Sequence, residues 1–367
     1  MFYTVQLDRS ATLYRNPVMT QTIKVGIVGY GYATATFHAP LIASTSGLEL
    51  VAIASSDASK VHAAWPKMAV CATAEALFSR GDIDLVIIPT PNDTHYALAA
   101  QALAAGKHVV VDKPFTLNTA DALDLIARAE QAQRVLAVFH NRRWDADFLT
   151  VQKLLASGEL GRVTHFESHF DRYRPEVRQR WREGAGPGSG LWYDLGPHLL
   201  DQALCLFGMP QTISLDLASQ RDGALTDDWF HAILRYGETR VILHASALVA
   251  HQGPRFVMHG SKGSYTKYGL DPQEDALKSG ARPVDENWGI DAQAGRLDIM
   301  RGSWMQQSTV PNQRGNYTHF YSAMRDAILH GAANPVPTME ALQVMRLIEL
   351  GNLGAAEGRM IQVINLR

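Results

Sequence analysis

The sequence predicts an α/β fold class, with an N-terminal doubly wound parallel sheet followed by a C-terminal α+β domain that has a large, mainly antiparallel sheet. The chain has 367 residues, a length that suggests two domains rather than one. Short β-branched runs alternate with alanine-rich stretches up to about residue 140, as in repeated βαβ units, and longer polar segments follow. We therefore expect residues 1–22 to be a loose N-terminal tail or the result of an upstream translation start. Residues 23–140 are expected to form a first, dinucleotide-binding domain, and residues 141–367 a second domain for substrate binding and oligomerisation.

Five apolar runs are expected to be the strands of the first domain. In chain order they are IKVGIVG, LELVAIAS, IDLVIIPT, KHVVVDKP and RVLAVFH. Each is followed by a stretch long enough for a crossover helix, such as NDTHYALAAQALAAG. Because crossover helices join parallel strands, this alternation predicts a parallel sheet covered by helices.

The second domain is expected to contain a different kind of sheet. Strand-like alternation occurs in VTHFESHFDRYR, FHAILRYG, RVILHASALVA and GPRFVMHG. Alternation of this kind is typical of a sheet with one covered face, as in antiparallel or mixed sheets. The segment TMEALQVMRLIELGNLGAAEG is predicted to form the closing helix.

Composition narrows the classes of partner. The formal net charge is −2 and the calculated pI is near 6.7, so no global basic field is present to attract nucleic acid or an anionic membrane. The apolar runs are far shorter than a membrane span, and the N-terminus lacks the apolar region of a signal peptide. The two cysteines, Cys71 and Cys205, are far apart in the sequence, which is typical of reduced thiols in a cytoplasmic protein. Together with the charge and the short apolar runs, this predicts a cytoplasmic protein with no nucleic-acid or membrane partner.

A glycine motif follows the first predicted strand. The stretch GYGYAT supplies Gly29 and Gly31, and Thr34 stands where a third glycine of the GxGxxG pattern would be expected. Glycines here allow a tight turn and close approach of the backbone to a pyrophosphate at a helix N-terminus. The motif and the βαβ units behind it predict a Rossmann-type dinucleotide site that includes Gly29, Tyr30, Gly31, Tyr32, Ala33 and Thr34.

The end of the second strand bears on which dinucleotide binds. An NAD site usually has Asp or Glu there to bind the ribose 2′-hydroxyl, whereas this chain has Ser55 and Ser56, with Lys60 close by and Asp57 displaced outward. A carboxylate at Ser55 would repel a 2′-phosphate, and hydroxyls would not. We therefore expect NADP (as NADPH in the reduced form), with NAD as a possible second cofactor.

Two further strand ends carry candidate cofactor-binding residues, namely Thr90, Pro91, Asn92, His95 and Lys113. Thr90 and Pro91 end one strand, and Asn92 or Thr94 can cap the next helix. His95 lies in the first turn of that helix, where a histidine is more often a packed or capping residue than a catalyst. Lys113 follows another buried strand at the same carboxyl edge, where ligands of open α/β sheets bind. Either this lysine is a solvated strand end, or its ammonium lies beside the nicotinamide ring and polarises a substrate oxygen.

Four stretches together resemble a known family. In order they are GYGYATATFHAPL, TPNDTHYALA, AGKHVVVDKPF and GSGLWYDLGPHLLD, and from Ile23 onward the chain resembles the glucose-fructose oxidoreductase, inositol dehydrogenase and rhizopine-catabolism family (Gfo/Idh/MocA). The triplet DKP stands where the family usually has EKP. The stretches HNRRWDADFLT, YRPEVRQRWRE and KYGLDPQEDALK resemble the branch that contains NADP-dependent scyllo-inositol dehydrogenase and related bacterial oxidoreductases.

The resemblance implies catalytic roles for Lys113, Asp194 and His198. Asp194 and His198 are four residues apart, near the start of a helix that Pro197 could begin, so both can face one cleft. His198 is the expected acid/base, Lys113 would stabilise a developing alkoxide, and Asp194 would orient the hydroxyl or the lysine. Asp201 could hold the imidazole, and no metal is required. Alternatively, Asp194 caps the helix and His198 is a satisfied buried histidine.

Substrate specificity is expected to come from the second domain. Hydrogen-bond donors interleaved with aromatic side chains suit a polyhydroxylated ring. The segments HNRRWDADF, YRPEVRQRWRE and WYD supply the candidates Asn141, Arg143, Trp144, Tyr173, Arg178, Trp181, Arg182 and Tyr193. Part of this set could instead contact another subunit, since arginine and tryptophan are enriched at protein interfaces. In the family that the chain resembles, the sheet of the C-terminal domain commonly makes subunit contacts. The resemblance therefore implies a homo-oligomer, a dimer or tetramer, that forms through this sheet.

Two classes of function remain open at this point. The first is an NAD(P)-dependent oxidoreductase that acts on a secondary alcohol or carbonyl of an inositol, sugar or related polyol, with a substrate like scyllo-inositol favoured; an aldehyde or aldose reductase would use the same groups. The second is a dinucleotide-binding sensor without catalysis, since folds can lose their chemistry. The presence of Lys113, Asp194 and His198 together argues for the enzyme.

Overall fold

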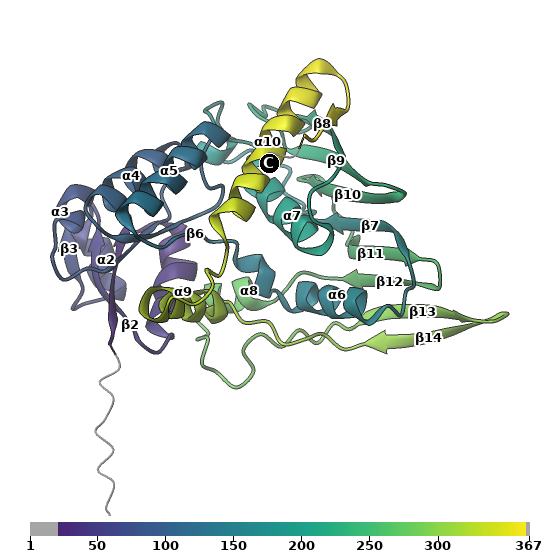
Figure 1. The fold of residues 1–367 in the computed structure, drawn as a ribbon, viewed down its shortest axis with the longest axis horizontal. Helices are drawn as coiled ribbons and strands as arrows, with labels where there is room; N and C mark the ends of the chain where they lie inside the picture. Colours follow the sequence, from purple (N-terminus) through teal and green to yellow (C-terminus); the bar gives the residue numbers. More distant parts are fainter. Residues whose placement is uncertain (1–20, 365–367) are drawn as a thin grey trace, which may run out of the picture.

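The computed structural model describes residues 21–364, and these form two sheets with helices packed against both (Figure 1). The predicted tail at 1–22 therefore lies outside the described residues, except for its last two. Within this part of the chain, no helix has both the length and the apolar character needed to cross a membrane.

The first sheet has six strands, and every neighbouring pair is parallel. The strands are β1 (Ile23–Val28), β2 (Leu48–Ala54), β3 (Ala69–Cys71), β4 (Leu85–Ile88), β5 (His108–Val111) and β6 (Leu136–Val138). Their order is β3-β2-β1-β4-β5-β6, so the chain moves outward from β1 to β3 and then returns to the other side of β1. This is the predicted doubly wound sheet, and its ligand-binding edge lies where β1 and β4 end.

Helices connect these strands. They are the π-helical segment η1 (Thr34–His38), α1 (Ala39–Ala43), α2 (Ala58–Ala64), α3 (Ala74–Phe78), the short 3-10 helix η2 (Asn92–Thr94), α4 (His95–Ala104) and α5 (Thr119–Ala132). The side chains of Asp57, Thr73 and Asn118 accept hydrogen bonds from backbone N–H groups at the starts of α2, α3 and α5. These local caps fix where each helix begins after its strand.

The second sheet has nine strands, and all of its pairs are antiparallel except that of β7 with β10. The strands are β7 (Val163–His169), β8 (Thr212–Ala218), β9 (Trp229–Tyr236), β10 (Thr239–Ser246), β11 (Pro254–Gly260), β12 (Gly263–Tyr268), β13 (Gly295–Arg301), β14 (Trp304–Val310) and β15 (Ile361–Gln362). Their order is β14-β13-β12-β11-β7-β10-β9-β8-β15. The predicted large, mainly antiparallel sheet is therefore confirmed.

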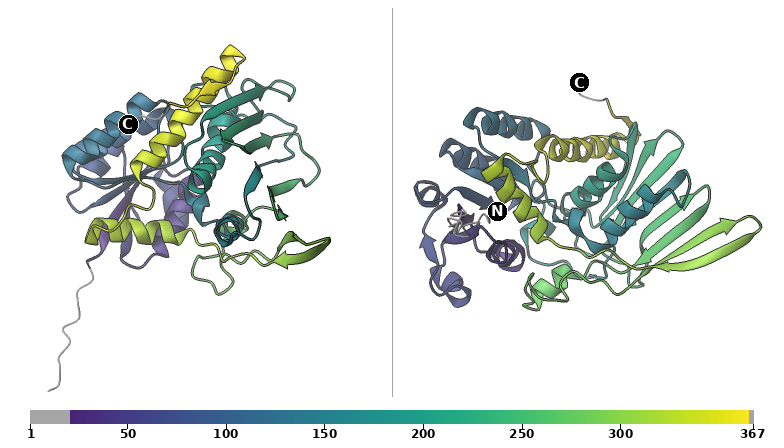
Figure 2. Two further views of the ribbon diagram at one scale, coloured as in Figure 1. Left: turned by 45° about the vertical axis from the view of Figure 1, so that its right-hand side comes forward. Right: turned by 60° about the horizontal axis from the view of Figure 1, so that its bottom comes forward.

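The remaining helices lie between the two sheets or on one face of the second (Figure 1, Figure 2). They are η3 (Asn141–Trp144), α6 (Ala146–Ser157), η4 (Trp181–Glu183), α7 (Leu191–Phe207), α8 (Gln273–Lys278), α9 (Thr318–His330) and α10 (Thr338–Glu357). The predicted closing helix is α10, and it contacts β6 and α5 as well as α7 and β8. The C-terminal part of the chain thus packs against both sheets.

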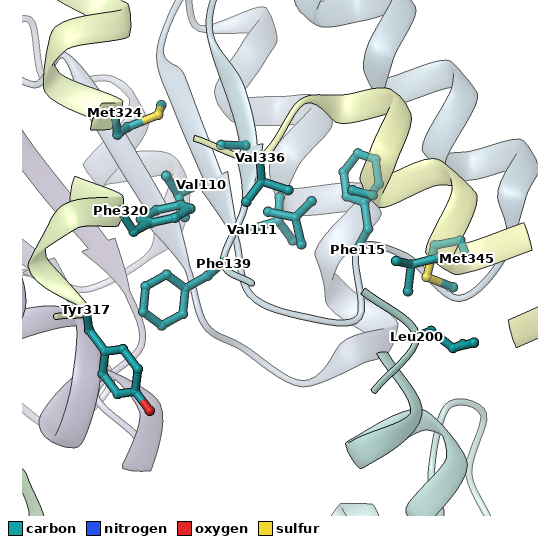
Figure 3. Packing of buried hydrophobic residues seen from close by; sticks show 14 of the residues in the cluster. Val110, Val111, Phe115, Phe139, Leu200, Tyr317, Phe320, Met324, Val336 and Met345 are labelled. Carbon is teal, nitrogen blue, oxygen red and sulfur yellow. The ribbon is translucent and has the colours of Figure 1, made fainter. Parts of the chain in front are cut away.

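One buried core joins the two halves of the molecule. Val110 and Val111 of β5 lie in the same cluster as Phe320 of α9 and Met345 of α10, and Phe139 stacks edge-on against Phe320 with ring centroids 5.0 Å apart (Figure 3). Burial of large apolar side chains is the main stabilising contribution in such a cluster. The shared core therefore holds the carboxyl edge of the first sheet against the helices of the second half.

Helix α7 differs in one respect from its prediction. It begins at Leu191, after Gly190, and Pro197 lies inside it rather than at its start. The helix ends at Phe207, directly before Gly208, which adopts a positive φ of 71°. Asp194 and His198 therefore lie in the first two turns of a longer helix than the sequence suggested.

Candidate active site

The glycine loop after β1 forms one wall of a pocket of about 460 Å³. Gly29 has a φ of 88°, in the left-handed region that favours glycine, and this turns the chain directly at the end of the strand. Six of the predicted cofactor residues line the pocket, namely Gly29, Tyr30, Gly31, Ser55, Ser56 and Lys60. The carboxyl ends of β1 and β2 thus place the predicted pyrophosphate and ribose residues in one pocket.

Asp57 also lines this pocket, but its carboxylate is already engaged. It accepts hydrogen bonds from Ser59 Oγ at 2.6 Å and from the backbone N–H of Lys60 at 3.1 Å. These hydrogen bonds lower the pKa of Asp57 from its ordinary value. The Ser55 hydroxyl is also engaged, since it donates to the Asp57 carbonyl and accepts from the Asp57 N–H, both at 3.1 Å. The Ser56 hydroxyl and the Lys60 ammonium line the same pocket, and such donors can bind a phosphorylated ribose.

The other predicted cofactor residues occupy different positions. Tyr32, Ala33 and Lys113 line a second, larger cleft. Thr34 is buried and donates a hydrogen bond through Oγ1 to the Gly29 carbonyl at 2.8 Å, so it supports the glycine loop.

The remaining four belong to the β4 edge. Thr90 and Pro91 come after β4 and Pro89, and the buried Asn92 donates through Nδ2 to the Gly188 carbonyl at 2.8 Å. The predicted role of His95 in cofactor binding does not match its surroundings. Its ring is fully buried, and its two nitrogens lie 2.8 Å and 2.9 Å from the carbonyl oxygens of Pro114 and Thr90. His95 is therefore a packing residue beneath the β4 edge.

The larger cleft has a volume of about 600 Å³ and lies between the two sheets. Its walls come from the glycine loop, the ends of β5 and β6, the segment after β7, and helices α7 and α8. The lining includes Tyr32, Asp112, Lys113, Asn141, Arg142, Arg172, Arg174, Arg178, Arg180, Trp181, Arg182, Asp194, His198, Glu274 and Lys278. All three predicted catalytic residues therefore face one cleft.

Lys113 and Asp194 form the central contact of this cleft. The Lys113 ammonium donates to Asp194 Oδ1 at 3.0 Å and to the Asp194 main-chain carbonyl at 2.7 Å. Both side chains are mostly buried. An ammonium has three N–H donors, so one remains for a substrate oxygen.

The surrounding charges keep Asp194 ionised. Burial raises the pKa of its carboxyl, but the positive charges of Lys113, Arg172 and Arg182 outweigh burial and hold that pKa well below its usual range. Asp112 behaves similarly, because His38 and Lys113 oppose the effect of burial and lower its pKa to about 2. The cleft thus presents two ionised carboxylates that both contact Lys113: Asp112 accepts from its backbone N–H at 2.7 Å, and Asp194 accepts from its ammonium.

His198 is buried beside this pair, one turn further along α7. Burial, together with the charges of Lys113 and Arg142, lowers its pKa well below the ordinary value of 6.5. Its Nδ1 is buried and has no hydrogen-bond partner in residues 21–364. The ring is therefore neutral at physiological pH, and Nε2 is the nitrogen available for proton exchange.

The prediction that Asp201 holds the His198 ring is wrong. Its carboxylate accepts hydrogen bonds from Arg143, with Nε at 2.9 Å from Oδ2 and Nη2 at 2.6 Å from Oδ1. Arg143 also pairs with Glu340 of α10 at 2.7 Å. Arg143 and Asp201 therefore join η3 to α7, outside the cleft.

The structure divides the predicted substrate residues into two groups. Four line the cleft, namely Asn141, Arg178, Trp181 and Arg182. Arg143, Trp144, Tyr173 and Tyr193 do not. Trp144 packs edge-on against Phe320, and Tyr193 donates to the Leu117 carbonyl at 3.3 Å. Tyr173 is exposed next to Leu248.

Sequence reasoning missed several cleft residues. Arg172 and Arg180 belong to the arginine-rich segment after β7, and the clustering of arginines there was the available signal. Glu274 of α8 accepts hydrogen bonds from Tyr32 at 2.9 Å and from Arg142 at 2.7 Å. Tyr32 and Glu274 are 242 positions apart in the sequence, so no local pattern could have paired them.

One cluster of potential metal ligands also escaped sequence reasoning, which had found none. His169, Asp171 and His244 present ligand atoms that all lie within 4.8 Å of one another. They are outside the cleft lining and come from segments about 75 positions apart in the sequence. Only the pairing of β7 with β10 brings them together.

Comparisons with known proteins agree with this arrangement. Residues 23–140 match the oxidoreductase family model with an NAD-binding Rossmann fold, and residues 152–363 match the C-terminal alpha/beta domain model of the same family. An uncharacterized oxidoreductase of Escherichia coli, YdgJ, is 57% identical over 333 residues, which cover 91% of this chain and 96% of that protein.

Two further comparisons extend over nearly the whole chain. The scyllo-inositol 2-dehydrogenase (NADP(+)) IolW of Bacillus subtilis is 39% identical, with 96% of this chain and 99% of that protein covered. A solved structure from Yersinia pestis is 53% identical and has a TM-score of 0.92, with 95% of this chain and 99% of that chain covered. The protein therefore belongs to the Gfo/Idh/MocA oxidoreductases and is an NAD(P)-dependent enzyme that acts on CH–OH groups.

Proposed function

We propose that the enzyme oxidises a secondary alcohol of an inositol, sugar or related polyol, or reduces the corresponding carbonyl, with NADP as its preferred cofactor and a substrate like scyllo-inositol. The observation that carries this proposal is the Lys113–Asp194 pair, which lies beside His198 in the cleft that also contains the glycine-loop residue Tyr32. The relationship to a scyllo-inositol 2-dehydrogenase supports the substrate class.

The residues that would hold the dinucleotide are those of the two adjoining pockets. The glycine loop would bind the pyrophosphate, and Ser55, Ser56 and Lys60 would bind a 2′-phosphate on the ribose. Tyr32, Ala33 and Lys113 would lie along the nicotinamide end. When bound, the nicotinamide ring gives or accepts the hydride.

The side chains of the cleft would manage the proton and the developing charge. His198, neutral because of its lowered pKa, takes the hydroxyl proton through Nε2 during oxidation. The remaining N–H of Lys113 donates to the substrate oxygen and stabilises negative charge on it. Asp194 fixes the lysine and, through its second carboxylate oxygen, can accept a hydrogen bond from a neighbouring hydroxyl.

The arginines after β7 would recognise the rest of the substrate. Arg172, Arg174 and Arg178 line the cleft, and among residues 21–364 none of their guanidinium groups makes a hydrogen bond. Burial, aided by the charge of Arg174, lowers the pKa of Arg172 to about 10, which still leaves it protonated near neutral pH. These guanidinium donors and the Trp181 ring line the same cleft, and the combination suits a ring that carries several hydroxyl groups.

A panel of substrates tests this proposal. The purified protein would be assayed with NADP and NAD separately against scyllo-inositol, myo-inositol and several aldoses, and in reverse against the related ketones and simple aldehydes. Turnover of an inositol or sugar, faster with NADP than with NAD, is expected. Turnover of aldehydes alone would instead favour an aldehyde reductase, and binding of NADPH without any turnover would oppose both assignments.

We also propose that the chain forms a homo-oligomer, a dimer or tetramer, through its nine-stranded sheet. Helices α6, α7 and α10 lie on one face of that sheet (Figure 2), and the edge strand β14 carries the exposed apolar residues Trp304 and Met305. An exposed apolar patch on a sheet is a common subunit contact. Sedimentation velocity at several concentrations would detect the assembly, and a monomer throughout would contradict it.

A further inference from the structure

The outward face of the second sheet carries a row of histidines and carboxylates that the proposed reaction does not use. Parallel pairing of β7 with β10 puts His169 directly beside His244, and antiparallel pairing of β10 with β9 puts His231 beside His244. Their neighbours Ser168, Leu243 and Ala232 are buried on the opposite face. Because side chains alternate along a strand, this row points away from the helices.

Asp171 completes the row two positions beyond His169. Each of its carboxylate oxygens faces one histidine: Oδ2 lies 3.6 Å from His169 Nδ1, and Oδ1 lies 3.6 Å from His244 Nε2. These separations are longer than an ordinary hydrogen bond. They are close to the separation of about 3.4 Å expected for two ligands bonded to the same tetrahedral zinc ion at about 2.1 Å.

The neighbouring carboxylate orients the His169 ring. Glu167 Oε2 lies 2.7 Å from His169 Nε2, so it accepts that N–H and leaves Nδ1 as the nitrogen directed toward Asp171. Histidine ligands of metals are usually oriented by a carboxylate in this way.

One further observation indicates a missing partner. Asp171 Oδ1 is buried and accepts no hydrogen bond within residues 21–364. A buried carboxylate oxygen without a partner is costly, and a proton held on His169 would leave this oxygen unpaired. A divalent cation bonded to Asp171, His169 Nδ1 and His244 Nε2 would give this oxygen a partner.

We propose that His169, Asp171 and His244 form a binding site for a divalent transition-metal ion such as Zn²⁺, with Glu167 as the orienting residue for His169. Two imidazoles and one carboxylate are a suitable ligand set for this class of cation. The site is structural rather than catalytic, since Arg172 on the same segment lines the cleft and the three ligands lie outside that lining. It would fix the end of β7 to β10.

Zinc binding by the metal-stripped protein, prepared without a histidine tag, tests the site. Calorimetry with Zn²⁺ is expected to give one ion per chain, and Co²⁺ is expected to give the visible absorption bands of a four-coordinate ion. The variants Asp171→Asn and His244→Gln should each weaken binding by about tenfold or more. The matched control His259→Gln, on the same sheet face but bonded to Ser264 instead, should bind zinc like the wild type.

Measurements of folding and of enzyme activity on the two ligand variants show whether a substitution removes only the metal site or disrupts the whole fold. Both ligand variants should keep wild-type circular dichroism and NADPH-linked turnover, and Zn²⁺ should raise the melting temperature of the wild type and the control alone. Less than stoichiometric binding by the wild type would overturn the proposal even if a variant failed to fold. Equal zinc affinity in the wild type and both folded ligand variants would also overturn it.

Discussion

Lys113, which is separated from the end of β5 by Asp112, donates two hydrogen bonds to Asp194 in the first turn of α7, one to its carboxylate and one to its main-chain carbonyl. This contact joins the carboxyl edge of the parallel sheet to a helix of the second half of the chain. Because the carboxylate holds the ammonium in the cleft, the pair places a fixed positive charge where a substrate oxygen would become negative.

Removal of the ammonium should impair catalysis more than cofactor binding. Lys113→Ala is expected to lower kcat/KM for the polyol by about 10²- to 10⁴-fold, since it removes both the hydrogen bond and the charge that stabilise the alkoxide. The dissociation constant of NADPH, measured by nicotinamide fluorescence, should change by only a few-fold. Near-normal turnover would remove Lys113 from the mechanism.

The pH dependence should reflect the neutral state of His198. Its pKa is lowered below 6.5, so the ring keeps its ability to accept a proton as the pH falls through 6.5. We expect kcat/KM for alcohol oxidation to show no loss between pH 7 and pH 6, and to fall only at lower pH. If the pH profile of kcat/KM instead fell with a midpoint near pH 6.5, and His198→Asn removed that fall, the imidazole of His198 would titrate as it does in solution.

Cofactor preference should depend on the hydroxyl at the end of β2. Ser55→Asp introduces a carboxylate into the pocket that also contains Lys60, and it should weaken NADPH binding by tenfold or more, about 1.4 kcal/mol, while leaving NADH binding similar or tighter. Ser79→Asp adds the same charge after α3, outside that pocket, and serves as the control. An unchanged ratio of NADPH to NADH affinity would mean that Ser55 does not face the ribose.

Arg178 should act on substrate binding. It lines the cleft and makes no side-chain hydrogen bond within residues 21–364, so its donors are available to a hydroxylated ring. Arg178→Leu is expected to raise KM by about tenfold, the loss of one charge-assisted hydrogen bond, with kcat changed much less. Arg235→Leu, on the exposed side of β9, should leave both constants as they are. Equal effects of the two substitutions would exclude Arg178 from the substrate site.

Arg143 should act on stability instead. Its guanidinium pairs with the nearly fully buried Asp201, so Arg143→Leu would leave that carboxylate without its partner and lower the free energy of unfolding by about 3–5 kcal/mol. Arg296→Leu, which removes the exposed pair with Asp298, should cost less than about 1 kcal/mol. Urea unfolding measures both; a raised KM with unchanged stability in Arg143→Leu would restore its predicted role in the cleft.

The sequence was sufficient for the fold class because its evidence is local. Continuous apolar runs, the glycine turn at Gly29 and the closing helix α10 each depend on residues near one another in the chain. The candidate catalytic residues could also be predicted from the sequence. Lys113 is marked by its position after a strand, and Asp194 and His198 are marked by the motif that contains them. All three were found to line one cleft.

The remaining features depend on contacts between distant segments. The sequence predicted that Arg143 would line the cleft, whereas the structure has Arg142 there. The packing of η3 decides this, since Arg143 is hydrogen-bonded to Asp201 of α7 and Arg142 to Glu274 of α8. His95 follows a strand end that sequence reasoning marked correctly, but its ring points into the core. No spacing rule could show which side of a short helical turn each side chain would face.

Transfer of a labelled hydride tests the central claim most directly. The wild-type enzyme would be incubated with NADP and scyllo-inositol deuterated at its ring carbons, and the reduced nucleotide would be analysed by mass spectrometry. We expect NADPH that carries one deuterium, formed much more slowly by Lys113→Ala and His198→Asn. Absence of any reduced nucleotide, with this substrate and with other polyols and sugars, would contradict it.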